Sequence, residues 1–177
     1  LSYSIRKLGS QFSVDLAYQE AILKNDYILT EGIESKQSFH SLLPSIQGRL
    51  ELNSKTRLFA RYSTSTSEPT ISQLQNVVNN TSPLFISIGN PDLDQTYIHS
   101  LRLGARYVNS EKNISLSNFS SVQNSVNYIG ENTSVLTSDS LINGVMLQRG
   151  AQLTSLSNVN GYWSAQNNTT FGIAVPK

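Results

Sequence analysis

The sequence contains no cysteine among its 177 residues, which excludes a disulfide scaffold, thiolate metal sites and cysteine nucleophiles. Charged residues make up only 14% of the chain, against about a quarter in globular proteins. The formal net charge of +1 provides no electrostatic attraction for nucleic acid. No apolar run approaches the length of a transmembrane helix, so any crossing of a membrane must use strands.

Small polar residues replace the missing charged and apolar ones. Hydrophobic residues reach 38%, also below average, and Ser, Asn, Thr and Gln fill the gap. This composition suits an outer-membrane barrel, whose lumen is polar and whose lipid face needs apolar residues only at alternate positions. The chain opens on strand-like "LSYSIRKLGS" without a signal peptide and stops at "FGIAVPK". We therefore expect a mature chain or a fragment of a larger protein.

Apolar and polar residues alternate along much of the chain, which predicts antiparallel strands. In "YIHSLRLGARY", Tyr97 and Leu103 lie on one face, and Arg102 and Arg106 lie on the other. Seven strands are predicted, at residues 1–6, 11–29, 39–52, 57–65, 97–108, 113–137 and 145–175, the last with bulges near Gly150 and Gly161.

One predicted strand fits the alternation poorly. In residues 113–137, Asn118, Ser120 and Asn124 share a face with Leu116, Val122 and Val126. These polar residues imply either a patch covered by protein or a shifted register.

The connections alternate between short and long, as in outer-membrane barrels. Short turns are expected at residues 6–10, 53–56 and 109–112, and longer loops at 30–38, 66–95 and 138–144. Pro69 and Thr70 predict the start of one short helix within the longest loop. Gly89 is expected to allow the chain to reverse near the end of this loop.

Charged residues in the regular parts of the strands lie opposite the apolar face. They are Asp15, Arg49, Glu51, Arg57, Arg61, Arg102 and Arg106. A charge in mid-bilayer costs about 2–4 kcal/mol, so a lipid-facing surface would show this bias. A soluble sheet with one solvated face would show it too. The alternative is therefore a soluble β-sandwich or adhesin-like binding module, although strand length and loop parity favour the membrane.

The passage "GNPDLDQTYIHSLRLGARY" at residues 89–107 resembles a passage of TonB-dependent outer-membrane receptors. Residues 39–93, including "EPTISQLQNVVNNTSPLFISIGNPDL", and "LSNVNGYWSAQNNTTFGIAV" near the end are similar to the Bacteroidetes-type barrel of that family. The sequence departs from the family after Leu93, where Asp94, Gln95 and Thr96 replace a lysine-proline-glutamate-like triplet.

The resemblance implies an all-β, antiparallel up-and-down transmembrane barrel in the bacterial outer membrane. Residues 1–177 would form part of a single barrel domain of about 22 strands, without the plug domain. The implied function is energised nutrient uptake. The implied partners are the remainder of the receptor, outer-membrane lipid, TonB acting through the plug, and a surface lipoprotein.

No catalytic constellation is found, and we expect neither an enzyme nor a cofactor or metal. His40 and His99 are far apart in sequence, and the acidic stretch at residues 92–94 reads as a solvated turn. The lumen-facing arginines are expected to hold plug carboxylates or an anionic substrate, and amides of the longest loop are expected to contact the nutrient. The candidate site residues are Arg57, Arg61, Arg102, Arg106, Gln73, Gln75, Asn79 and Asn80.

Overall fold

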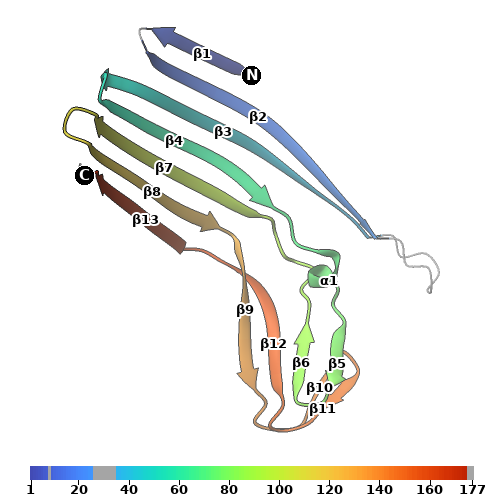
Figure 1. Ribbon diagram of the computed structural model, residues 1–177. Coiled ribbons are helices and arrows are strands. Elements are labelled where there is room, and N and C mark those ends of the chain that lie inside the picture. Colours follow the sequence, from blue (N-terminus) through green and yellow to red (C-terminus); the bar gives the residue numbers. More distant parts are fainter. Residues whose placement is uncertain (8, 26–34, 175–177) are drawn as a thin grey trace.

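The computed structural model describes residues 1–7, 9–25 and 35–174. Most of them form one seven-stranded sheet, here called the wall sheet (Figure 1). In spatial order its strands are β1 (Ser2–Lys7), β2 (Ser10–Asn25), β3 (Ser35–Asn53), β4 (Thr56–Ser67), β7 (Thr96–Asn109), β8 (Ile114–Val126) and β13 (Tyr162–Ile173). Every pair of neighbours is antiparallel, which confirms the predicted up-and-down fold.

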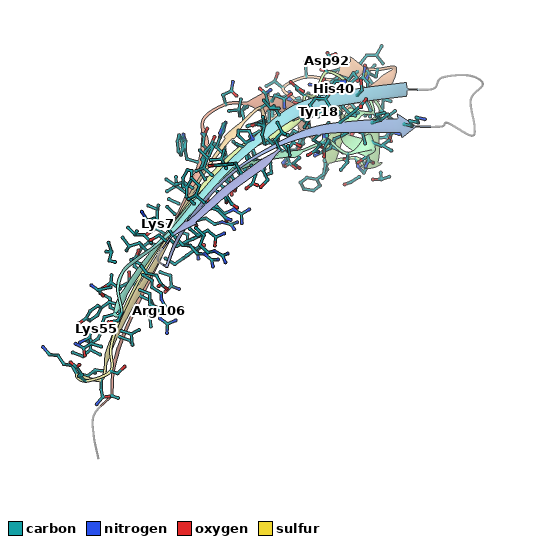
Figure 2. All side chains as sticks on the ribbon, turned by 90° about the horizontal axis from the view of Figure 1, so that it is seen from above. Lys7, Tyr18, His40, Lys55, Asp92 and Arg106 are labelled. Atoms are coloured by element: carbon teal, nitrogen blue, oxygen red, sulfur yellow. The ribbon has the colours of Figure 1, made fainter. Side chains whose placement is uncertain are left out.

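The wall sheet is an open arc with two free edges. Seen edge-on in Figure 2, it is bowed, and Arg106 lies on its concave side. β1 and β13 form the two edges, and within residues 1–7, 9–25 and 35–174 neither pairs with the other nor with a second neighbour. The residues of β13 are exposed apart from Gly172, as expected for a strand that has a neighbour on one side only.

The apolar face of the wall sheet is uncovered. Phe12, Leu50 and Leu103 remain 46%, 44% and 45% exposed, although each lies on a strand that has a neighbour on both sides. A soluble sandwich would bury these side chains under a second sheet. Nothing in the described part of the chain packs over them, so this face fits lipid and not a soluble core.

The two ends of the wall sheet differ. At one end, here called the turn end, residues 53–56 and 109–112 form tight turns that a salt bridge joins, with Lys55 Nζ and Glu111 Oε2 3.1 Å apart. At the opposite, loop end, β2 and β3 reach 16 and 19 residues. About nine to eleven residues suffice to cross a bilayer, so these two strands project beyond it. Residues 26–34, including much of the predicted loop at 30–38, lie outside the described residues.

Aromatic side chains lie on the apolar face at both ends of the wall sheet. Tyr97 marks the loop end of β7 and Tyr107 its turn end, on the same face. Ten residues of strand span about 34 Å. Tilted by about 40°, they span roughly 25 Å of membrane, the height of the apolar band of a barrel. The positions of these tyrosines therefore match the two interfaces of a bilayer.

Both histidines lie on this same face and pair with tyrosines. The Tyr18 hydroxyl is 2.8 Å from His40 Nδ1, and the Tyr62 hydroxyl is 2.8 Å from His99 Nδ1. The rings of each pair are stacked. The two histidines thus belong to the aromatic belt at the loop end.

A second, smaller sheet lies beyond the loop end (Figure 1) and is here called the loop sheet. Its strands, in spatial order, are β5 (Val78–Ser82), β6 (Phe85–Ile88), β12 (Gln152–Val159) and β9 (Tyr128–Val135). A hairpin of β10 (Ser140–Ile142) and β11 (Val145–Leu147) adjoins it. Val78, Ile86, Leu147 and Ala151 form a buried core here, whereas the wall sheet has no comparable cluster among the residues described.

The prediction of single long strands at 113–137 and 145–175 was wrong. Asn127, with φ of 54°, separates β8 from β9, and Gly161, with φ of 85°, separates β12 from β13. Positive φ is the left-handed region, which turns the chain out of the extended path. At these two residues the chain therefore passes between the sheets: β8 and β13 belong to the wall sheet, and β9 and β12 belong to the loop sheet.

The longest loop also contains more structure than predicted. The short helix is confirmed as α1 (Ile71–Leu74), where Thr70 and Gln73 form a reciprocal capping box. β5 and β6 were not predicted. No helix in the described ranges is both long and apolar enough to span a membrane.

Candidate functional site

The four predicted arginines gather on the concave face of the wall sheet. Their register places Arg57 directly opposite Arg106, and Arg61 directly opposite Arg102, across the β4–β7 pair. All four are exposed. The alternation of each strand thus produces two cross-strand pairs of like charge on the same face, separated by the row of Phe59 and Gly104.

Most of this charge is not neutralised within the described residues. Arg57 Nε forms a salt bridge with Glu51 Oε1 at 2.9 Å. Arg61, Arg102 and Arg106 form none with any acidic group of residues 1–7, 9–25 and 35–174. Like charges directly opposite on a sheet destabilise it, so this face is suited to bind an anion.

A cavity of about 400 Å³ lies in the loop region, between α1 and the loop sheet. Three of the predicted loop residues, Gln73, Gln75 and Asn79, line it. Asn80 is exposed but does not line the cavity. The remaining lining residues are Ser72, Val77, Ser87, Ile88, Gly89, Glu131, Thr154 and Leu156.

The chemistry of the cavity combines hydrogen-bonding groups with an apolar surface. Amides and hydroxyls alternate with Val77, Ile88 and Leu156, and Glu131 is the single ionisable residue among those that line it. A site lined by a carboxylate and no cation disfavours anions. It suits a neutral or cationic ligand that donates and accepts hydrogen bonds.

Close backbone contacts hold α1 against β6. The Asn90 N–H donates to the Gln73 carbonyl at 2.7 Å, and the Asn90 side chain donates to the Leu156 carbonyl at 3.1 Å. A Cβ on Gly89 would overlap the carbonyl oxygens of Gln75 and Gln73. Gly89 is not among the glycines with positive φ, so the expectation of a reversal there was wrong, and close backbone approach explains the residue.

Polar side chains fasten the longest loop to the wall. Gln19 on β2 donates to Glu68 Oε1 at 2.9 Å, and Gln95 donates to Ser41 Oγ on β3 at 2.7 Å. Within the wall sheet, the Tyr97 hydroxyl on β7 also donates to the Leu42 carbonyl on β3, at 2.7 Å. The cavity is thereby positioned over the loop end of the wall sheet.

The arginines and the cavity are separate sites. Six residues separate Arg102 from the start of β7 at Thr96, about 20 Å of strand, and the loop sheet lies beyond that point. Sequence reasoning missed Glu131, Thr154 and Leu156 because it assigned them to wall strands. Their contribution depends on the turns at Asn127 and Gly161.

Comparison with known proteins agrees with this architecture. A model of the outer membrane protein beta-barrel family matches residues 19–174. The chain belongs to this family. The predicted outer-membrane location and barrel fold are thereby confirmed. None of the curated proteins matches the chain significantly.

Solved receptor structures share the fold at low sequence identity. The siderophore receptor PirA of Pseudomonas aeruginosa matches with a TM-score of 0.57 and 13% identity, over 90% of this chain and 31% of PirA. The ferric enterobactin receptor PfeA of the same organism matches at 0.56 and 14%, over 91% and 24%. The hemophore receptor HasR of Serratia marcescens matches at 0.52 and 11%, over 92% and 28%. The chain therefore spans less than a third of each of these receptors.

Proposed function

We propose that this family member forms the wall and ligand-binding loop segment of a TonB-dependent outer-membrane transporter that takes up a nutrient with energy input. The observation that carries the proposal is the loop cavity. It lies beyond the loop end of the same wall sheet whose concave face holds the arginines. The two free edges of that sheet support the remainder of a receptor barrel as the partner, because unpaired backbone groups are costly in lipid.

In this proposal the cavity makes the first contact with the nutrient. Gln73, Gln75 and Asn79 would bind it, together with Glu131. The balance of lining groups favours a neutral, hydroxyl-rich or cationic ligand over an anionic chelate. Asn80, which does not line the cavity, is not assigned a role in binding.

The arginines would act at a second stage. Arg61, Arg102 and Arg106 would pair with carboxylates of a plug domain and release them as the plug moves. An anionic substrate could bind to the same arginines in place of the plug carboxylates. Salt bridging within the barrel, as between Arg57 and Glu51, is the structural alternative.

The test uses the full receptor, purified in detergent and screened by thermal shift against ferric siderophores, haem and neutral oligosaccharides. For a probe that stabilises the wild type, Gln75→Ala should lower the affinity at least about tenfold. Asn80→Ala should leave the affinity for the same probe unchanged. Accumulation of that probe by cells should require TonB. Uptake that persists without TonB, or equal effects of the two variants, would refute the proposal.

A further inference from the structure

A groove of about 590 Å³ lies on the lipid-facing side of the wall sheet. Gly48 on β3 and Ala60 on β4, which lie directly opposite each other, form its floor. The next residues of the same row are Phe12 on β2 and Leu103 on β7, and they form its two walls. Two of the smallest side chains thus lie between two large ones, and the apolar face is hollowed there.

The groove becomes polar toward the turn end. Leu50 and Leu58, another directly opposed pair, continue its apolar lining beyond the floor. Lys7 and Ser10 also line it, and they pair with each other where β1 ends and β2 begins, at the first tight turn. Ser10 lies two residues before Phe12, so the alternation places this pair on the face of the groove. The groove therefore runs from a cation at the turn end into the apolar band.

The floor and walls of the groove belong to strands whose neighbours are all described. β2, β3, β4 and β7 each have a hydrogen-bonded neighbour on both sides, and only β1, which supplies Lys7, is an edge. A further barrel strand would extend the sheet beside β1 and would not lie over the floor. The outward face of a membrane barrel contacts lipid, so this position favours a lipid molecule as the occupant.

The charge of the turn end indicates which lipid fits. Each of the three tight turns carries a lysine, namely Lys7, Lys55 and Lys112. Glu111 is the single acidic residue in the sequence of these turns, and it pairs with Lys55. Basic residues at a membrane surface attract anionic lipid, and a lysine ammonium binds phosphate as a point charge. The turn end is therefore complementary to the phosphate of a phospholipid headgroup.

We propose that the groove holds one phospholipid of the periplasmic leaflet. Lys7 and the Ser10 hydroxyl bind the phosphate, and one acyl chain lies over Gly48 and Ala60 between the two walls. The long lysine side chain follows the apolar surface while its ammonium group stays among the headgroups. The small floor residues let the acyl chain approach the backbone closely, as small residues do between packed membrane helices. The proposal rests on the outer-membrane location and is independent of any transport function.

The test uses the complete protein, purified in mild detergent and titrated with dipalmitoyl phosphatidylglycerol, with binding followed by native mass spectrometry. The wild type should retain one phosphatidylglycerol per protein molecule. Ala60→Leu should weaken this binding at least about tenfold, because the added side chain fills the floor of the groove. Ala105→Leu is the matched control and should leave the affinity unchanged. Ala105 is also exposed and, opposite Leu58, shares the face, but it does not line the groove.

A second pair of variants tests the phosphate contact. Lys7→Gln and Lys112→Gln each remove one positive charge from the turn end, but only Lys7 lines the groove. Lys7→Gln alone should weaken the binding of phosphatidylglycerol, and it should not change the binding of dipalmitoylglycerol, which has the same chains and no phosphate. Loss of all phosphatidylglycerol from the wild type, or equal affinities within either pair of variants, would overturn the proposal. Equal affinity of the wild type for the two lipids would overturn it as well.

Discussion

The side chain of Asn158 pairs with the backbone of Asp94 in both directions. The Asp94 N–H donates to Asn158 Oδ1 at 2.7 Å, and Asn158 Nδ2 donates to the Asp94 carbonyl at 3.0 Å. The same Nδ2 also donates to the Asn127 carbonyl at 2.8 Å. The acidic stretch at residues 92–94, expected to be only a solvated turn, thus ends at a joint between the longest loop and the loop sheet.

Asn127 makes the turn between β8 and β9 through its positive φ, and its substitution tests whether this turn separates the two strands. Asn127→Ala should destabilise the loop sheet by up to about 1–2 kcal/mol, because Ala bears the full cost of positive φ, whereas the Asn side chain offsets part of it through local hydrogen bonds. Asn127→Gly should cost less, although it also loses the bond from Nδ2 to Asp94 Oδ2 at 3.2 Å. Hydrogen exchange of β9 and β12 measures both. A larger loss of protection in the glycine variant would contradict the argument.

Gly89→Ala should open the cavity by displacing α1 from β6, since the new Cβ would overlap two backbone carbonyls. Exchange of residues 71–90 should rise while that of the wall sheet stays unchanged. Gly48→Ala is the control, because its Cβ would meet only the Phe12 ring, at an ordinary 3.9 Å. The argument fails if the two variants exchange alike.

Leu103→Arg should impair folding into membranes by about 2–4 kcal/mol, because the charge would face mid-bilayer. Arg102→Leu, one residue away on the concave face, should cost less. Urea titration of refolding into lipid vesicles compares the two. The reverse order would mean that the faces are interchanged.

The loop end should face the cell exterior and the turn end the periplasm, as in barrels with short periplasmic turns. Asn79→Cys should therefore react with a membrane-impermeant maleimide on intact cells, and Ser110→Cys only after the outer membrane is opened. Both residues are exposed, so accessibility within the protein does not limit labelling. Equal labelling of the two on intact cells would contradict this orientation.

The wall strands were predictable because one face must be apolar and the other polar over a regular period of two. β4 and β7 follow this rule along most of their length, and the arginine face follows from it. The hairpin of β10 and β11 was not predicted, although its sequence contains a hairpin signal. Asn143 and Gly144 adopt φ of 49° and 78°, as an Asn-Gly turn between two strands does.

The loop sheet was not predictable from local patterns. β6 pairs in parallel with β12, so that Phe85 lies beside Gln152. No alternation or turn residue near either strand indicates such a distant partner. The same limit applies to the cavity. Gln73, Gln75 and Asn79 followed from their loop position, whereas Glu131 and Thr154 are brought in by long-range pairing.

The parallel β6–β12 pair also bears on the order of assembly. Antiparallel neighbours that a tight turn connects can pair outward from that turn, because their first contacts are close in sequence. β6 can meet β12 only after the chain has returned through β7, β8 and β9, which makes this contact a late and slow one. A ligand that binds at the cavity would therefore require β6, β9 and β12 to be assembled first.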